Sequence, residues 1–252
     1  MKRAPLVTTL LILFLALVPA GIALADQTYT VAGRDTFSIG AGDIRSEISY
    51  AGTQTLSVRR HGHVTRYRAH VVYRRSDGDA STAASGEYVS DVADAGNSVD
   101  SANGDPDYLT VLNQPFAAQL DPPTLADLRH LKGAVPFDFP SPITGASLHG
   151  YLKRAGAGTI GRHGALGVSF EAAGPMSGAL PDRPGLRLNG TITMRGTAYY
   201  DLDSTLLLTL DTTVTITGNV SNRLGKDPVT ITYARLIRAA TPPAAQATSV
   251  AR

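Results

Sequence analysis

The chain contains no cysteine, and this absence excludes several kinds of protein at once. None of its 252 residues can form a disulfide or bind a metal through a thiolate, and none can carry the lipidated cysteine of an anchored lipoprotein. The stability of the fold must therefore come from its apolar core.

An excess of one charge is also missing once the first residues are set aside. The sequence has 23 Lys and Arg against 21 Asp and Glu, and Lys2 and Arg3 account for the difference. No global charge therefore favours nucleic acid as a partner.

The N-terminal residues have the pattern of a secretory signal peptide over 1–25. The two basic residues precede an apolar run over 6–18, and the small residues of 23–25 precede Asp26. An uncleaved membrane anchor is the alternative, but Pro19 and Gly21 interrupt the run. We expect cleavage after Ala25 and an exported protein, periplasmic or extracellular, with no stable membrane span afterwards. An exported chain without disulfides fits a bacterial periplasm or cell surface.

A first β-hairpin is predicted around a turn at His61 and Gly62. In this register Val58 faces Thr65 and Leu56 faces Tyr67, so apolar side chains collect on one face. The opposite face carries a candidate anion patch for a carboxylate or phosphate, formed by Arg66, Arg68, His70 and Arg74. The alternative is a solvated outer face, neutralised by the acidic residues that follow in the chain.

Metal binding is a weaker hypothesis for the same region. Only His61 and His63 could converge, because His63 and His70 point to opposite faces of the predicted hairpin. A calcium site from Asp100, Asn103, Asp105 and Asp107 lacks the EF-hand spacing. We therefore predict no metal ligands, with a metal-dependent hydrolase that uses the His61 and His63 region as an alternative.

A longer hairpin is predicted over 187–221, with Asp203, Ser204 and Thr205 as its turn. Its register pairs Tyr200 with Leu208, Ile192 with Ile216 and Gly190 with Gly218, and leaves Thr193 and Thr215 on the reverse face. The apolar face is the candidate ligand site: Leu188, Ile192, Met194, Tyr200, Leu208, Leu210, Val214 and Ile216. An ordinary filled core is the alternative explanation of this face.

The remaining segments complete a mainly β fold with one short helix. The helix is predicted over about 122–132, where leucines recur at helical spacing after Asp121 and Pro122. An acidic flexible loop is expected over about 90–107, and a disordered tail over 240–252. We predict a single domain over 26–239: a long curved antiparallel meander, as a half-barrel or open barrel, with the helix against it.

Export, long meandering strands, a helix at mid-chain and the run GTAYYDLDSTLLLTLD followed by TTVTITGNV resemble the half-barrel cell-envelope proteins of the LolA and LppX group. The likeness covers about residues 28–237 in outline. It implies a lipid or other apolar molecule held in the concave face, or a role as an envelope interaction module.

No motif specifies a reaction. Ser147 and Ser169 lack a glycine-flanked nucleophile elbow, and neither an S-x-x-K nor an H-E-x-x-H sequence occurs. We therefore predict a non-enzymatic protein without a cofactor, which binds a lipid-like molecule or an envelope protein on its concave face. A structural protein of the cell envelope without a ligand is the alternative.

Overall fold

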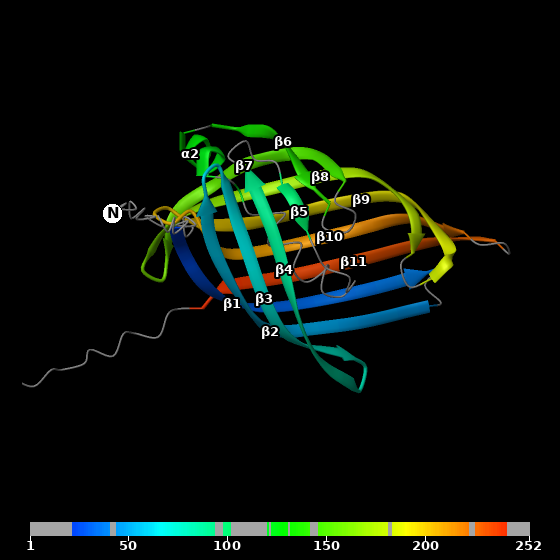
Figure 1. Cartoon of the computed structure of the whole chain (residues 1–252). Coiled ribbons are helices and arrows are strands. Elements are labelled where there is room, and N and C mark those ends of the chain that lie inside the picture. The colour runs from blue at the N-terminus through cyan, green and yellow to red at the C-terminus, as the bar shows by residue number, and fades with distance from the viewer. Residues whose placement is uncertain are drawn as a thin grey trace, which may run out of the picture.

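One open antiparallel sheet makes up nearly all of the protein. The computed structural model describes residues 22–40, 44–93, 98–101, 120, 122–130, 132–141, 146–180, 183–221 and 225–240. Within these ranges the chain forms eleven strands in one curved sheet and one short helix (Figure 1). The predicted fold class, a mainly β curved meander with one helix, is confirmed.

The strands are unusually long, and several exceed fourteen residues. In chain order they are β1 (Ile22–Ile39), β2 (Ile44–His61), β3 (Val64–Asp77), β4 (Ala80–Ala93), β5 (Ser98–Ser101), β6 (Ala134–Pro140), β7 (Ser147–Ile160), β8 (His163–Leu180), β9 (Arg183–Asp201), β10 (Leu207–Ser221) and β11 (Lys226–Ala239). The helix α2 (Pro122–His130) lies between β5 and β6 in sequence.

Two meanders are joined into the sheet by its first and last long strands. The order is β5-β4-β3-β2-β1-β11-β10-β9-β8-β7-β6, so among the described strands β1 and β11 are the pair that joins strands distant in sequence. This pairing runs from Tyr29 opposite Ala239 to Ile39 opposite Val229. The sheet ends at β5 and β6 and is not closed.

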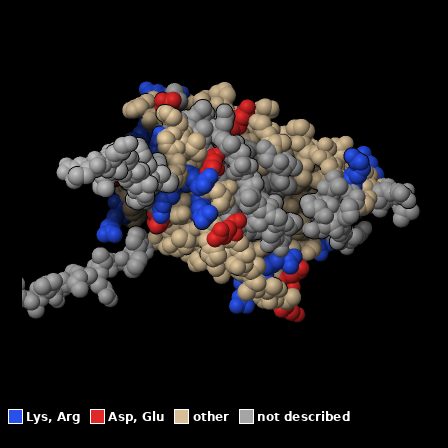
Figure 2. Space-filling model, in the orientation of Figure 1, with Lys and Arg blue, Asp and Glu red and all other residues tan. Residues whose placement is uncertain are grey.

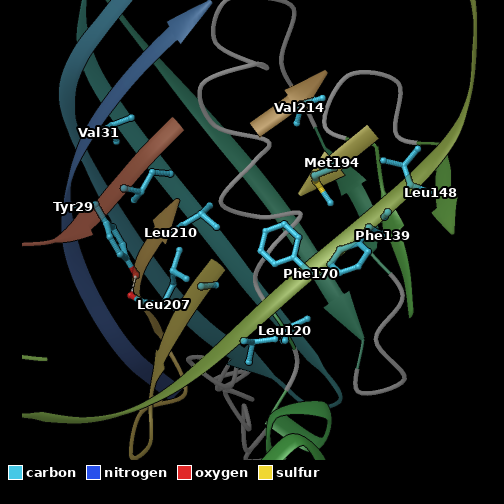
Figure 3. Packing of buried hydrophobic residues seen from close by; sticks show 14 of the residues in the cluster. Tyr29, Val31, Leu120, Phe139, Leu148, Phe170, Met194, Leu207, Leu210 and Val214 are labelled. Atoms are coloured by element: carbon cyan, nitrogen blue, oxygen red, sulfur yellow. Dashed lines mark hydrogen bonds between the residues drawn. The ribbon is translucent and has the colours of Figure 1, made fainter. Parts of the chain in front are cut away.

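The two faces of the sheet differ sharply in polarity. Along β3, for example, buried and exposed residues alternate, with Tyr67, Ala69, Val71 and Tyr73 buried. Because side chains alternate in a strand, most large apolar residues collect on one side of the sheet, and Figure 3 shows Val31, Leu210 and Phe170 among those directed into this interior. The concave face is therefore the core of the protein, and the convex face is polar.

The register of the long hairpin is confirmed over most of its length. From Arg187 opposite Ser221 to Tyr199 opposite Thr209, each pair is the predicted one, including Gly190 opposite Gly218. The prediction is wrong at the turn, where Leu207 and not Leu208 lies opposite Tyr200. The turn is longer because the Asp201 carboxylate accepts the N–H groups of residues 203 and 204, which adds a bulge at the start of β10.

The register of the first hairpin is wrong by two residues. Gly62 and His63 form the turn, so Val58 lies opposite Tyr67 rather than Thr65. In the structure Gly62 takes the first turn position with a φ of 60°, and His63 follows without a positive φ, which is the pattern of a type II′ turn rather than the predicted turn with glycine second. A shift of two residues leaves every side chain on its predicted face.

Helix α2 lies within the predicted range and contacts the sheet through buried leucines. Leu125 and Leu128 are buried in the core. The Arg129 guanidinium donates a hydrogen bond to the carbonyl of Leu202, and Arg154 donates to the carbonyl of Arg129 at 2.9 Å. These contacts place α2 against the β9–β10 turn, at one end of the concave face (Figure 1). No helix in the described ranges has the length and apolar character needed to cross a membrane.

The predicted acidic loop is wrong wherever the structure describes it. Residues 90–93 belong to β4 and 98–101 form β5. The pairing of Asp91 with Arg66 across β4 and β3 holds this segment in the sheet. The rest of that segment, the signal peptide as far as residue 21 and the tail from residue 241 lie outside the described residues. Strand β1 begins at Ile22, so the predicted cleavage after Ala25 falls inside it.

Candidate functional site

The predicted apolar face lies on the concave side of β9 and β10. All eight of its residues are buried, from 0% exposure at Leu210 to 6% at Leu208: Leu188, Ile192, Met194, Tyr200, Leu208, Leu210, Val214 and Ile216. Figure 3 shows Met194, Leu210 and Val214 directed into the same interior as Tyr29, Val31 and Phe170. Seven of them meet in one core cluster, whereas Leu208, at the bulge of β10, is buried outside that cluster and Leu207 belongs to it instead. The role of these residues in binding stays a prediction.

Two tyrosines lie at the end of this interior nearest to α2. The Tyr29 hydroxyl donates to the carbonyl of Leu207 at 2.9 Å, which ties β1 to the start of β10 (Figure 3). Burial raises the pKa of Tyr29 and of Tyr200 well above the ordinary value, because a phenolate would lose its hydration there. Both side chains therefore stay neutral and act as large apolar groups with one polar tip.

A buried ion pair interrupts the apolar interior. Arg235 on β11 donates from Nη1 to Oδ1 of Asp35 on β1 at 2.5 Å. The two side chains have exposures of 0% and 2%, so water screens this pair very little. The same Nη1 also donates to the carbonyl of Ala234 at 2.8 Å.

The neighbours of Arg235 are shaped to hold its long side chain. Gly33 lies opposite Arg235, and a Cβ on Gly33 would come within 2.8 Å of both Cδ and Nη1 of the arginine. The Tyr50 ring lies with its centroid 4.8 Å from Arg235 Cζ, which is a cation–π contact. Glycine therefore provides the space, and tyrosine provides an electron-rich surface over the guanidinium.

A row of polar and small residues crosses the sheet at the level of Arg235. Following the register from β3 to β9, the row is Arg75, Tyr50, Gly33, Arg235, Thr212 and Gly196. On both sides of this row lie Leu210 and Val214 on β10, and Ile237 and Tyr233 on β11. The concave interior is thus a polar belt between two apolar regions.

Two nitrogen atoms of Arg235 lack partners. Its Nε and Nη2 are buried and make no hydrogen bond within the part of the chain that the structure describes. Gln54 Oε1, on the concave side of β2, is likewise buried and unpaired among these residues. Unsatisfied buried polar atoms destabilise a fold, so such groups indicate a role beyond packing.

The predicted anion patch lies on the opposite, convex face. Its members Arg66, Arg68, His70 and Arg74 are all exposed on β3. Arg66 is already held by Asp91, whose Oδ1 and Oδ2 accept from its Nε and Nη2 at 2.7 and 2.6 Å. This hydrogen-bonded pair raises the pKa of Arg66 and lowers that of Asp91.

Acidic side chains accompany the basic ones over the face that Figure 2 shows, instead of leaving a continuous basic surface. On β3 and β4, Glu87 lies opposite His70, and Asp91 lies opposite Arg66. This favours the alternative of a solvated outer face whose charges are balanced locally.

The histidines do not form a metal centre in the described residues. His61 and His63 are exposed at the hairpin turn, while His149 contacts Asp138 at 2.8 Å and His163 contacts Asp201 at 2.5 Å. Over the described ranges no group of three or more His, Asp or Glu side chains could hold a metal ion. Of the suggested calcium ligands, Asp100 lies in β5, and residues 103, 105 and 107 lie outside the described residues.

Sequence reasoning missed Arg235 and Asp35, although a signal for both was present. The alternation of Val229, Ile231 and Tyr233 continues to Arg235, which places a charge at an inward position of β11. Asp35 has the same place in the alternation of β1, after Val31 and Gly33. A charged residue in phase with buried apolar ones is the pattern that predicts a buried polar site.

Comparison with known proteins identifies no family and no protein of known function for this chain. No family model matches the chain, and no curated protein matches it. One solved structure, a conserved protein of unknown function with a hot dog fold from Alicyclobacillus acidocaldarius, is 13% identical to it, with a TM-score of 0.14. That match covers 85% of this chain and 80% of the other, and so low a TM-score carries no argument. None of these findings connects the chain with the LolA and LppX group.

Proposed function

We propose that this chain is an exported, non-enzymatic protein that binds an apolar, lipid-like molecule on the concave face of its sheet. The observation that carries the proposal is the polar belt around Arg235 inside an otherwise apolar interior. A core that serves stability alone is better filled with apolar side chains than with a buried and incompletely bonded ion pair. Ligand sites, in contrast, combine an apolar lining with a few polar groups.

The open sheet supports the same proposal. Strands β5 and β6 are the two ends of the described strand order and are not paired with each other, as in a sheet that is open on one side. The resemblance to envelope carriers in the LolA and LppX group agrees with a ligand of this kind and with export.

A structural protein without a ligand is the second candidate. It is favoured by the low exposure of the eight predicted residues, since side chains packed to 6% exposure or less are also what a filled core contains.

Two measurements separate these candidates. Mass spectrometry of an organic extract of the natively purified protein should find a co-purifying apolar molecule. After delipidation, a neutral naphthylamine probe should bind saturably, at about one molecule per chain. A clean extract together with an absence of probe binding would support the structural protein.

Export is tested on its own by N-terminal sequencing of the chain recovered outside the cytoplasm. We expect Asp26 as the first residue. An intact N-terminus that begins at Met1 would contradict the proposed cleavage.

A further inference from the structure

The same side of the guanidinium is occupied in one arginine of this protein, Arg66, and has no partner among the described residues in another, Arg235. The nitrogens Nε and Nη2 point in parallel and form a fork that matches the two oxygens of a carboxylate. In Arg66 this fork holds the Asp91 carboxylate at 2.7 and 2.6 Å on the convex face. In Arg235 the same two nitrogens have no partner in the described residues.

The position of Arg235 is set by contacts that do not use the fork. Asp35 and the carbonyl of Ala234 both accept from Nη1, and the Tyr50 ring lies against the guanidinium carbon. Gly33 leaves room for the side chain to lie across β1. The arginine is therefore held in place while its carboxylate-binding side remains unused, as in a preorganised site.

We propose that Arg235 binds the carboxylate of a long-chain acid through Nε and Nη2, with the apolar chain lying along the concave face. This inference rests on the proposed function, and it defines the ligand class as an anionic amphiphile. The flanking apolar regions, with Leu210 on one side of the belt and Val214 and Ile231 on the other, would contact the chain.

The charged residues of the belt help to decide whether the head group of the ligand is anionic or neutral. Asp35 already balances Arg235, so a bound carboxylate must be offset by other groups. Arg75 stands in the same row and points inward, and its ion pair with Asp77 is long, at 3.8 Å, and part-exposed. The belt thus contains a second guanidinium, and this added positive charge favours an anionic head over a neutral one.

The test compares two probes that differ only in the head group, dodecanoic acid and dodecanol, each displacing the neutral naphthylamine from the delipidated protein. The natural chain should bind the acid more tightly by at least about tenfold, because only the carboxylate fills both positions of the fork. Equal affinities would overturn the inference and leave the proposed function standing. If neither probe displaces a bound naphthylamine, the inference also fails, and the proposed function fails only if the naphthylamine does not bind and the organic extract is clean.

Substitutions assign any preference to Arg235. In Arg235→Gln the acid should lose its advantage over dodecanol, and in the control Arg66→Gln the ratio of the two affinities should stay at the natural value. A preference that persists in folded Arg235→Gln would overturn the assignment.

Asp35→Asn provides an independent readout if Arg235→Gln does not fold. Removing the competing carboxylate should strengthen binding of the acid several-fold, and dodecanoic acid should raise the melting temperature of this variant more than that of the natural chain. An unchanged or weakened affinity for the acid, or a smaller rise in melting temperature, would mean that the fork binds only water or that the pair is purely structural.

Discussion

The ion pairs Arg66–Asp91 and Arg235–Asp35 show how the two faces of one sheet use the same chemistry. Arg66 is exposed and fully engaged, with both oxygens of Asp91 on its fork. Arg235 is buried and only partly engaged, through Nη1 alone. Bulk water satisfies an unpaired group on the convex face at little cost, whereas a group on the concave face is removed from bulk water and depends on a partner there. An arginine with unpaired N–H groups therefore indicates a binding role only where it is buried in the interior.

The largest difference in stability is expected between variants that break the buried ion pair and the exposed one. Arg235→Gln leaves Asp35 buried without its partner and should lower the free energy of unfolding by about 3–5 kcal/mol. Arg66→Gln should leave the urea midpoint unchanged within error, because both groups reach water. Urea melts followed by far-UV circular dichroism measure both.

The double variant Asp35→Leu with Arg235→Met sharpens this result. Apolar replacement of a buried pair is often neutral or stabilising, so the variant should recover most of the stability lost in Arg235→Gln. If it is as unstable as the single variant, the loss comes from packing rather than from the unpaired charge.

The concave and convex faces of the long hairpin should also respond differently. Ile216 is buried opposite Ile192, so Ile216→Ala should cost about 2–5 kcal/mol. Thr215 lies on the other face opposite Thr193, and Thr215→Ala should cost no more than about 0.5–1 kcal/mol. Equal or inverted losses in urea would contradict the register.

Gly33 and Gly158 compare a crowded glycine with an open one. A methyl group at Gly33 would collide with the Arg235 side chain, so Gly33→Ala should cost about 1–3 kcal/mol and move the guanidinium. At Gly158 nothing lies within 4 Å of an added Cβ, and the substitution should be close to neutral. Similar thermal melts for the two variants would mean that Arg235 is not held across Gly33.

The smallest effect is expected at the β9–β10 turn and depends on pH. Burial acts to raise the pKa of Asp201, but the N–H groups of Asp203 and Ser204 and the His163 ring outweigh it and hold the pKa below the ordinary value. A carboxylate with a lowered folded pKa stabilises the protein above its unfolded pKa of about 3.9, and this stabilisation is lost as pH falls through the folded value.

Asp201→Asn removes this titration and keeps an oxygen that can accept from the turn. The variant should be less stable near neutral pH and lose less stability between about pH 5 and pH 2 than the natural chain. If urea melts at several pH values show that both proteins lose the same free energy of unfolding over this range, the assignment to Asp201 is wrong.

Local patterns predicted the sheet better than they predicted the candidate site. The alternation from Ile192 to Ala198 and from Leu210 to Ile216 determined which face is buried, because a strand has only two faces. The turns were harder, since the bulge at Leu208 depends on side-chain hydrogen bonds of Asp201 and the first hairpin on which turn position Gly62 takes.

The site depends on contacts across the sheet that no local pattern contains. Asp35 and Arg235 are 200 positions apart and meet only because β1 pairs with β11. Each residue could have been identified as an inward charge from its own strand, but their pairing and the unused side of the guanidinium required the three-dimensional structure.

The most direct test is a crystal structure of the protein with a brominated dodecanoic acid, in which anomalous scattering locates the bromine. The account predicts bromine on the concave side of the sheet and the carboxylate within hydrogen-bond distance of Nε and Nη2 of Arg235. Bromine on the convex face, or an interior in which water alone occupies the fork of Arg235, would contradict it.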